Sequence, residues 1–234
     1  MFTYYIAETQ DASGIDPRVV AYYSPGSIIV EQYRNIKTYI SSLNGGDLFR
    51  SLMVTSAKRT EGKSLTCVNL AVTMAEDKDK TTILVDLNFR SPKLSSLVNA
   101  KPSKGLSDYF NNEARLDEIL TKTSINNLMI LSSGNMPSNP AGFFTYQRIK
   151  ELIAELEKHF NYIILDTPAL IPFADARTFA PAVDGVILAV SAGKTRREVV
   201  WRAEEQIKSV RGKLIGVVLT QVEYYIPEYI HRHL

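Results

Sequence analysis

The chain has 234 residues, of which 45% are hydrophobic and 22% charged, and its formal net charge is only +2. This composition excludes intrinsic disorder as the main state, and the small net charge gives no indication of a nucleic-acid partner. The single cysteine, Cys67, cannot form an intrachain disulfide, which is typical of a reducing compartment. Apolar stretches are far shorter than the roughly 20 residues that cross a bilayer, and the N-terminus lacks a secretory signal pattern. We therefore expect a cytoplasmic globular protein.

Short apolar segments alternate with longer helical patterns from residue 28 onward, after an N-terminal part, residues 1–27, that we expect to be an irregular arm. Strands are predicted at 52–55, 82–86, 128–131, 162–166, 185–191 and 214–220. Helices are predicted at 28–43, 64–76, 142–159 and 196–210. The strand segments lack polar alternation, which indicates strands covered on both faces. The pattern predicts a doubly wound α/β domain over 28–220, with a mainly parallel sheet, and a tail over 221–234.

A phosphate-binding turn is predicted directly after the first strand. Residues 56–64 read Ser-Ala-Lys-Arg-Thr-Glu-Gly-Lys-Ser, which is the P-loop pattern with Ala57 in place of its first glycine. A P-loop turns backbone N–H groups toward phosphate oxygens at a helix N-terminus. We expect Lys63 to reach the β- and γ-phosphates and the Ser64 hydroxyl to bind Mg²⁺. The predicted nucleotide-binding residues are Ala57, Lys58, Arg59, Thr60, Glu61, Gly62, Lys63, Ser64 and Leu65.

Two positions of this turn leave alternatives open. Thr60 stands where related loops have glycine, and a β-branched residue resists positive φ. Either the loop closes with a negative φ at Thr60, or it binds phosphate more loosely. Lys58 is either a second phosphate-binding lysine, acting in its own subunit or across a dimer, or a solvated loop charge.

Two predicted strands end in aspartate, Asp86 and Asp166. The carboxyl ends of parallel strands face the ligand crevice of a doubly wound sheet, so both carboxylates are expected beside the P-loop. Mg²⁺ prefers a few carboxylates together with water and phosphate oxygens. We therefore expect Ser64, Asp86 and Asp166 to form the metal site. The predicted catalytic residues are Lys63, Asp86 as base or metal-shell ligand, and Asp166 as the residue that orders the metal's water.

The ordered set of motifs resembles the bacterial tyrosine kinases of capsule and exopolysaccharide synthesis. The motifs are Ser-x5-Gly-Lys-Ser at 56–64, Asp-x-Asn-x-Arg at 86–90 and Ile-Leu-Asp-Thr-Pro at 164–168, which correspond to the family's Walker A, A′ and B motifs. Further similar segments lie at 31–37, 104–109 and 134–141. The resemblance implies an ATP- and Mg²⁺-dependent protein-tyrosine kinase. Asn88 departs from it, because the family has a second aspartate there.

The resemblance also implies assembly. Residues 31–37 are similar to the family's Glu-x2-Arg-x2-Arg oligomerisation helix, with Glu31, Arg34 and Lys37 three residues apart on one face. An ion pair within the helix is the alternative explanation. The family's C-terminal tyrosine cluster corresponds here to Tyr224, Tyr225 and Tyr229, which are either phosphorylation sites presented to a neighbouring subunit or aromatic packing residues. The implied partners are further copies of the chain and a membrane adaptor of the polysaccharide co-polymerase type, which recruits the kinase to the inner membrane face.

Two other functions remain open at this stage. The loss of a carboxylate at Asn88, together with Thr60, favours a weak or inactive nucleotide-binding regulatory subunit of the same machinery. Lys58 stands where partitioning and septum-positioning ATPases carry their signature lysine, but Arg59 and Thr60 replace the glycines of that loop.

Overall fold

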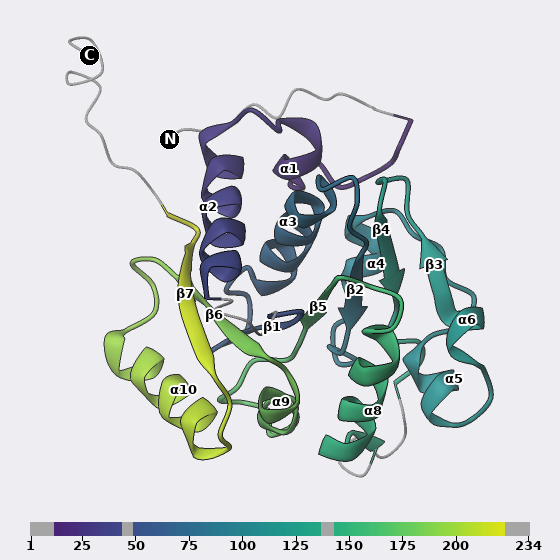
Figure 1. Ribbon diagram of the computed structural model, residues 1–234. Helices are drawn as coiled ribbons and strands as arrows, with labels where there is room; N and C mark the ends of the chain where they lie inside the picture. The colour runs from purple at the N-terminus through teal and green to yellow at the C-terminus, as the bar shows by residue number, and fades with distance from the viewer. Residues whose placement is uncertain (1–11, 44–48, 137–142, 223–234) are drawn as a thin grey trace.

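The computed structural model describes residues 12–43, 49–136 and 143–222, and within them a seven-stranded sheet with the order β3-β4-β2-β5-β1-β6-β7 (Figure 1). The strands are β1 (Ser51–Ser56), β2 (Thr82–Asp86), β3 (Leu120–Lys122), β4 (Leu128–Leu131), β5 (Tyr162–Asp166), β6 (Gly185–Ser191) and β7 (Leu214–Thr220). Only β3 runs antiparallel to its neighbour, and the other pairs are parallel. The predicted doubly wound, mainly parallel α/β fold is confirmed.

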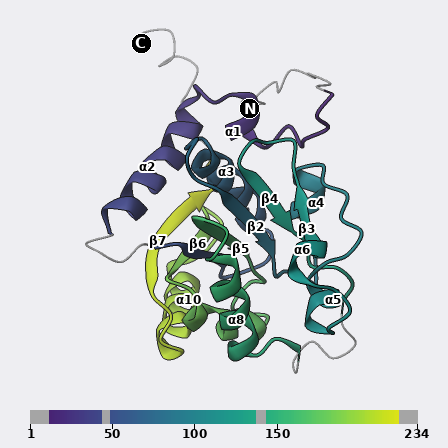
Figure 2. The ribbon, with the colours of Figure 1, turned by 45° about the vertical axis from the view of Figure 1, so that its right-hand side comes forward.

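Helices cover both faces of the sheet (Figures 1 and 2). One face carries α1 (Val20–Tyr23), α2 (Ile28–Ser42), α3 (Lys63–Ala75) and α4 (Leu94–Leu97). The other carries α8 (Tyr146–Leu156), α9 (Asp175–Phe179), the 3-10 turn η1 (Ala180–Ala182) and α10 (Arg197–Ser209). The short helices α5 (Leu106–Phe110) and α6 (Leu116–Ile119) lie near β3. None of the helices in these ranges has the length and hydropathy needed to span a bilayer.

The strands are apolar on both sides because each one contributes to two cores. Leu52 and Val54 of β1 pack with α1–α4, whereas Met53 packs with α8–α10. All six residues of β1 are buried. Burial of apolar area on both faces contributes roughly 25 cal/mol per Å². This explains why the strands read as continuous runs of Leu, Ile and Val rather than as alternating patterns.

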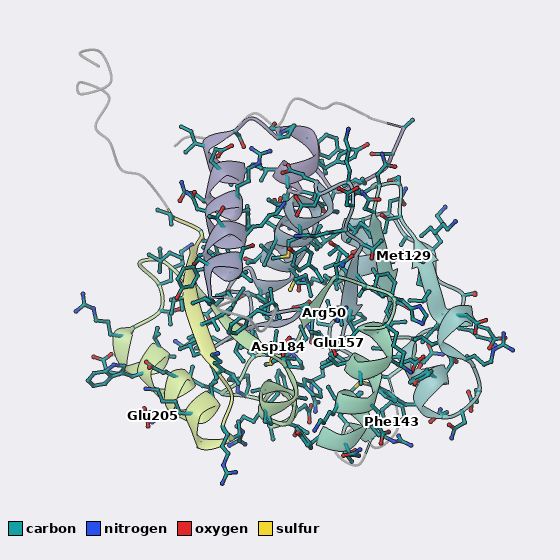
Figure 3. All side chains as sticks on the ribbon, viewed as in Figure 1. Arg50, Met129, Phe143, Glu157, Asp184 and Glu205 are labelled. Carbon is teal, nitrogen blue, oxygen red and sulfur yellow. The ribbon has the colours of Figure 1, made fainter. Side chains whose placement is uncertain are left out.

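At the amino ends of the central strands, Asp184 holds the start of β1 in place. Its Oδ2 atom accepts hydrogen bonds from the backbone N–H groups of Arg50 (2.9 Å) and Ser51 (2.8 Å) and from Ser51 Oγ (2.7 Å). Arg50 also donates to the carbonyls of Phe160 and Glu157 at the end of α8, so that Arg50, Glu157 and Asp184 meet in Figure 3. These bonds join the start of β1 to the residue before β6 and to the chain segment that follows α8.

The structure differs from the sequence prediction in its shortest elements. Within residues 12–27 it places the four-residue helix α1, whose Ala21 N–H donates to Asn69 Oδ1 of α3 (2.9 Å). The predicted helix 142–159 begins only at Tyr146, because the Thr145 hydroxyl accepts the Arg148 N–H and caps it. β3 and helices α4, α5, α6 and α9 were not predicted. Each has only three to five residues, too few to show a hydrophobic period.

Candidate nucleotide-binding site

The predicted phosphate loop connects β1 to α3 at the carboxyl edge of the sheet. β1 ends at Ser56, and α3 begins at Lys63 after the N-cap residue Gly62, which has φ 79°. Lys58, Arg59 and Thr60 form the exposed outer bend. This is the strand–turn–helix arrangement that the sequence predicted, and it places the N-terminus of α3, with its partial positive charge, at the phosphate loop.

The loop has backbone donors available for an anion. Among the described residues, the N–H groups of residues 59–62 form no hydrogen bond. The loop's shape is held from behind, where Ser56 Oγ donates to the Lys58 carbonyl (2.6 Å). Unpaired backbone N–H groups at a helix N-terminus are the chemistry that binds phosphate oxygens. This observation fits the predicted role of the loop.

Thr60 adopts the left-handed region, with φ 63°. The alternative in which the loop closes with a negative φ at Thr60 is therefore wrong. For an L-residue this conformation costs roughly 1–2 kcal/mol. The bend thus has the backbone shape for which glycine is the usual choice, but a threonine occupies it.

Glu61 has surroundings in the structure that the sequence does not indicate. A glutamate in a polar loop would normally be solvated, but Glu61 is only 3% exposed. Its Oε2 atom accepts the Lys58 N–H (2.7 Å), and its Oε1 atom accepts a hydrogen bond from Thr195, in the loop between β6 and α10. No local signal in the sequence indicates this burial, because Thr195 is distant in the chain.

Ser64 and Asp166 form a buried polar pair where the start of α3 meets the carboxyl end of β5. Ser64 Oγ donates to Asp166 Oδ2, and both residues are buried. The other oxygen, Oδ1, is buried without a hydrogen-bond partner in the described part of the chain. Burial, and next the negative charge of Asp86, raise the pKa of Asp166 to about 7. A buried hydroxyl–carboxylate pair with one unpaired oxygen fits a Mg²⁺ ion, which prefers hard oxygen ligands.

Asp86 lies beside Asp166 in the register of β2 and β5, but its carboxylate is already engaged. Oδ1 accepts the Asn88 N–H, and Oδ2 accepts the N–H groups of Lys93 and Leu94, each at 3.1 Å. Burial raises the pKa of Asp86, while these three donors oppose the rise. In the structure, Asp86 thus stabilises the turn that leads into α4.

Two arginines flank a phenylalanine near the loop. The guanidinium carbon of Arg90 lies 4.6 Å from the ring centroid of Phe173, and that of Arg59 lies 5.9 Å from it. Arg90 also forms an ion pair with Asp175 (2.9 Å). Nothing in the sequence marks Phe173, because its loop follows the Walker B segment without a recognisable pattern.

The three residues predicted to mediate oligomerisation have partners within the chain. Arg34 bonds to Glu31 and to Glu76 at the C-terminal end of α3, with Arg34 Nη2 2.7 Å from Glu76 Oε1. Lys37 Nζ lies 2.7 Å from Asp77 Oδ1. The predicted pair of Glu31 and Arg34 is present. Glu31, Arg34 and Lys37 form a charged seam on α2, and Arg34 and Lys37 also fasten α2 to the end of α3. The predicted phosphorylation sites Tyr224, Tyr225 and Tyr229 lie outside the described residues.

The geometry defines a P-loop nucleotide-binding protein with a doubly wound sheet. A family model described as an AAA domain matches residues 50–214. The tyrosine-protein kinase YwqD of Bacillus subtilis is 32% identical over 207 residues, which cover 88% of this chain and 87% of YwqD. The crystal structure of the chimerical protein CapA2B2 has a TM-score of 0.83 and 28% identity, covering 89% of this chain and 92% of that one.

The succinoglycan biosynthesis transport protein ExoP of Rhizobium meliloti is 28% identical over 211 residues, which cover 86% of this chain but only 26% of ExoP. The similarity to YwqD extends over nearly the whole of both chains and passes through the Walker A, A′ and B segments. The chain belongs to the AAA-domain family and, within it, to the family of bacterial tyrosine kinases, so the resemblance stated from the motifs is confirmed.

Proposed function

We propose that this protein is an ATP- and Mg²⁺-dependent tyrosine kinase that phosphorylates copies of its own chain and acts in exopolysaccharide synthesis and export. The observation that carries the proposal is the buried Ser64–Asp166 pair beside the loop N–H groups, in which one Asp166 oxygen and the N–H groups have no partner among the residues that the structure describes. The relationship to YwqD, named a tyrosine-protein kinase, supports the reaction. The relationship to ExoP, named a succinoglycan biosynthesis transport protein, supports the biological setting.

The residues around the phosphate loop have different roles in the proposed phosphoryl transfer. The N–H groups of the loop hold the phosphate oxygens, and Lys63, half-buried at the start of α3, adds a positive charge. Ser64 and Asp166 hold Mg²⁺, which supplies neutralisation of phosphate charge when it is bound. The acceptor is the hydroxyl of a tyrosine. Its oxygen forms a bond to the γ-phosphorus as the bond to ADP breaks, and its proton passes to the Asp86 carboxylate.

Asp86 has one acceptor direction left. A carboxylate offers about four lone-pair directions, and three of them are used by the backbone donors. The free direction is on Oδ1, which accepts one of the three hydrogen bonds. We therefore assign Asp86 to orienting the acceptor hydroxyl beside the Mg²⁺ site that Ser64 and Asp166 would form, where its charge would also favour the cation.

The proposed partners follow from the same relatives. We propose that the chain self-associates as a dimer or ring through Glu31, Arg34 and Lys37 and presents Tyr224, Tyr225 and Tyr229 to the crevice of a neighbour. We further propose a membrane adaptor of the polysaccharide co-polymerase type as its activator. The support is that ExoP contains a segment similar to this chain within a much longer transport protein. The protein then acts at the inner face of the membrane, and no nucleic acid takes part.

The test is incubation of the purified protein with labelled ATP and Mg²⁺. Wild type is expected to acquire label on Tyr224, Tyr225 or Tyr229, located by mass spectrometry, and Lys63→Met to acquire none. Triple replacement of these tyrosines by phenylalanine is the control for label elsewhere. Absence of phosphotyrosine from wild type, both alone and with the adaptor, contradicts the kinase proposal.

A second function is favoured by a specific observation. Asp86 is engaged by three backbone donors, and its neighbour Asn88 adds no carboxylate to the crevice. A regulatory subunit that binds nucleotide and signals by assembly does not require a further carboxylate for catalysis. It predicts that nucleotide changes the oligomer size without phosphotyrosine. Replacement of Asn88 by Asp separates the two proposals, because a large gain in phosphotransfer would show that the natural site is attenuated.

A further inference from the structure

The bend of the phosphate loop has to be held by something other than local preference. Thr60 and Gly62 are the residues of the loop with positive φ, and only the glycine adopts that region without strain. An exposed threonine would relax toward negative φ if nothing opposed it. The contacts around Thr60 therefore matter for the shape in which the loop meets a phosphate.

The carboxylate of Glu61 closes the bend from inside. By accepting the Lys58 N–H at 2.7 Å, it bridges across Arg59 and Thr60 and fixes the turn between them. Its second oxygen accepts a hydrogen bond from the Thr195 hydroxyl. A buried carboxylate is costly unless its lone pairs are satisfied, so these donors hold it firmly in place.

The end of β7 holds the bend from outside. Thr220 Oγ1 donates to the Glu61 carbonyl (2.8 Å), and Gln221 Nε2 donates to the Thr60 carbonyl (2.9 Å). In a planar trans peptide, the carbonyl and the following N–H point in opposite directions. The N–H groups of Glu61 and Gly62 are consequently turned away from β7.

We propose that Glu61 is a positioning residue of the nucleotide site. Its side chain, supported by Thr195, fastens the left-handed bend so that the loop N–H groups are already oriented before phosphate arrives. These contacts stabilise at Thr60 the left-handed conformation that a glycine would adopt without help. This inference rests on the proposed nucleotide site but not on the kinase reaction, because it concerns phosphate binding alone.

The experiment measures the affinity of a fluorescent ADP analogue with Mg²⁺ by anisotropy. Glu61→Ala removes both hydrogen bonds, and Thr195→Val removes one while keeping the side chain's shape. Each is expected to weaken binding roughly tenfold, because a bond to a charged group is lost. The double variant is expected to bind no more weakly than Glu61→Ala. Glu205→Ala, an exposed glutamate on α10, is the matched control and is expected to bind like wild type.

A glycine at position 60 separates positioning from general destabilisation. Thr60→Gly, introduced into Glu61→Ala, is expected to restore most of the affinity that Glu61→Ala loses, because glycine adopts the left-handed bend without strain. Circular dichroism of each variant verifies that it is folded. The proposal is overturned if Glu61→Ala binds like wild type, or if the added glycine restores none of the lost affinity.

The same samples incubated with Mg²⁺ and ATP keep the two proposals apart. ADP has no γ-phosphate to transfer, so a wild type that binds it in a Glu61-dependent manner but forms no phosphotyrosine, either alone or with the adaptor, overturns only the kinase proposal. A wild type that forms phosphotyrosine while Glu61→Ala keeps full ADP affinity overturns only the role of Glu61.

Discussion

Asp86 and Asp166 are paired in the register of neighbouring strands, yet the structure uses them in different ways. The Asp86 carboxylate accepts three backbone N–H groups of the segment that follows it. The Asp166 carboxylate accepts only the Ser64 hydroxyl, and its other oxygen has no partner among the described residues. One aspartate therefore stabilises the fold around the crevice, whereas the other is available to a cation.

Replacement of each aspartate by asparagine is expected to separate these roles. Asp86→Asn places an NH₂ group against backbone donors, so we expect the free energy of unfolding to fall by roughly 1–3 kcal/mol. Asp166→Asn retains a partner for Ser64 and is expected to fold at least as stably without metal, but to lose Mg²⁺-dependent nucleotide binding. Urea denaturation in EDTA and nucleotide titration with Mg²⁺ measure the two effects. Equal destabilisation by both substitutions would contradict this division.

The pH dependence of stability without metal is expected to reflect Asp166. Its pKa in the folded protein is about 7, above the ordinary 3.8, because of burial and the charge of Asp86. Between these values the folded state retains a proton that the unfolded state has released, so stability falls as pH rises toward about 7. Between about pH 5 and about pH 8, the free energy of unfolding of wild type should fall by roughly 2–3 kcal/mol more than that of Asp166→Asn. Denaturation in EDTA at both pH values measures the difference, and a constant gap between the two proteins contradicts it.

Two loops near the carboxyl end of β4 cross with no room for a side chain at Gly105. A Cβ atom there would lie 2.3 Å from the Gly134 nitrogen and 2.7 Å from the Ser132 carbonyl oxygen. Because both are backbone atoms, Gly105→Ala is expected to destabilise the protein by roughly 1–3 kcal/mol or more. Gly26→Ala is the matched control, since a Cβ at Gly26 meets nothing within 4 Å. Thermal unfolding of both variants provides the comparison, and equal melting temperatures would refute the predicted clash.

The charged seam of α2 has an intrachain partner that allows its proposed role in assembly to be tested. Arg34→Gln and Glu76→Gln break the same ion pair, and since both side chains are partly exposed to solvent, each should lower the free energy of unfolding only slightly. Only Arg34→Gln is expected to reduce self-association, because Arg34 belongs to the proposed seam. Sedimentation velocity measures the oligomer. An equal effect of both variants on assembly assigns Arg34 to the α2–α3 contact alone.

The parts of the fold that could be predicted are those with a long local signal. The buried strands are recognisable as runs of Leu, Ile and Val. The helix after the phosphate loop begins at Lys63, directly after Gly62. The short helices and β3 could not be predicted in this way, because pieces of three to five residues owe their form to packing against the sheet.

The doubly wound sheet, the place of the phosphate loop and the two strand-end aspartates could all be predicted from the amino-acid sequence, because each depends on residues adjacent in the chain. The contacts that those residues make became known from the fold. The fold buries Glu61 against Thr195, places Thr60 in the left-handed region and engages Asp86 with backbone donors. It also leaves one oxygen of Asp166 without a partner within the described ranges. The physical reason is that hydrogen-bond satisfaction and burial depend on partners far away in sequence, which no local pattern of residues can specify.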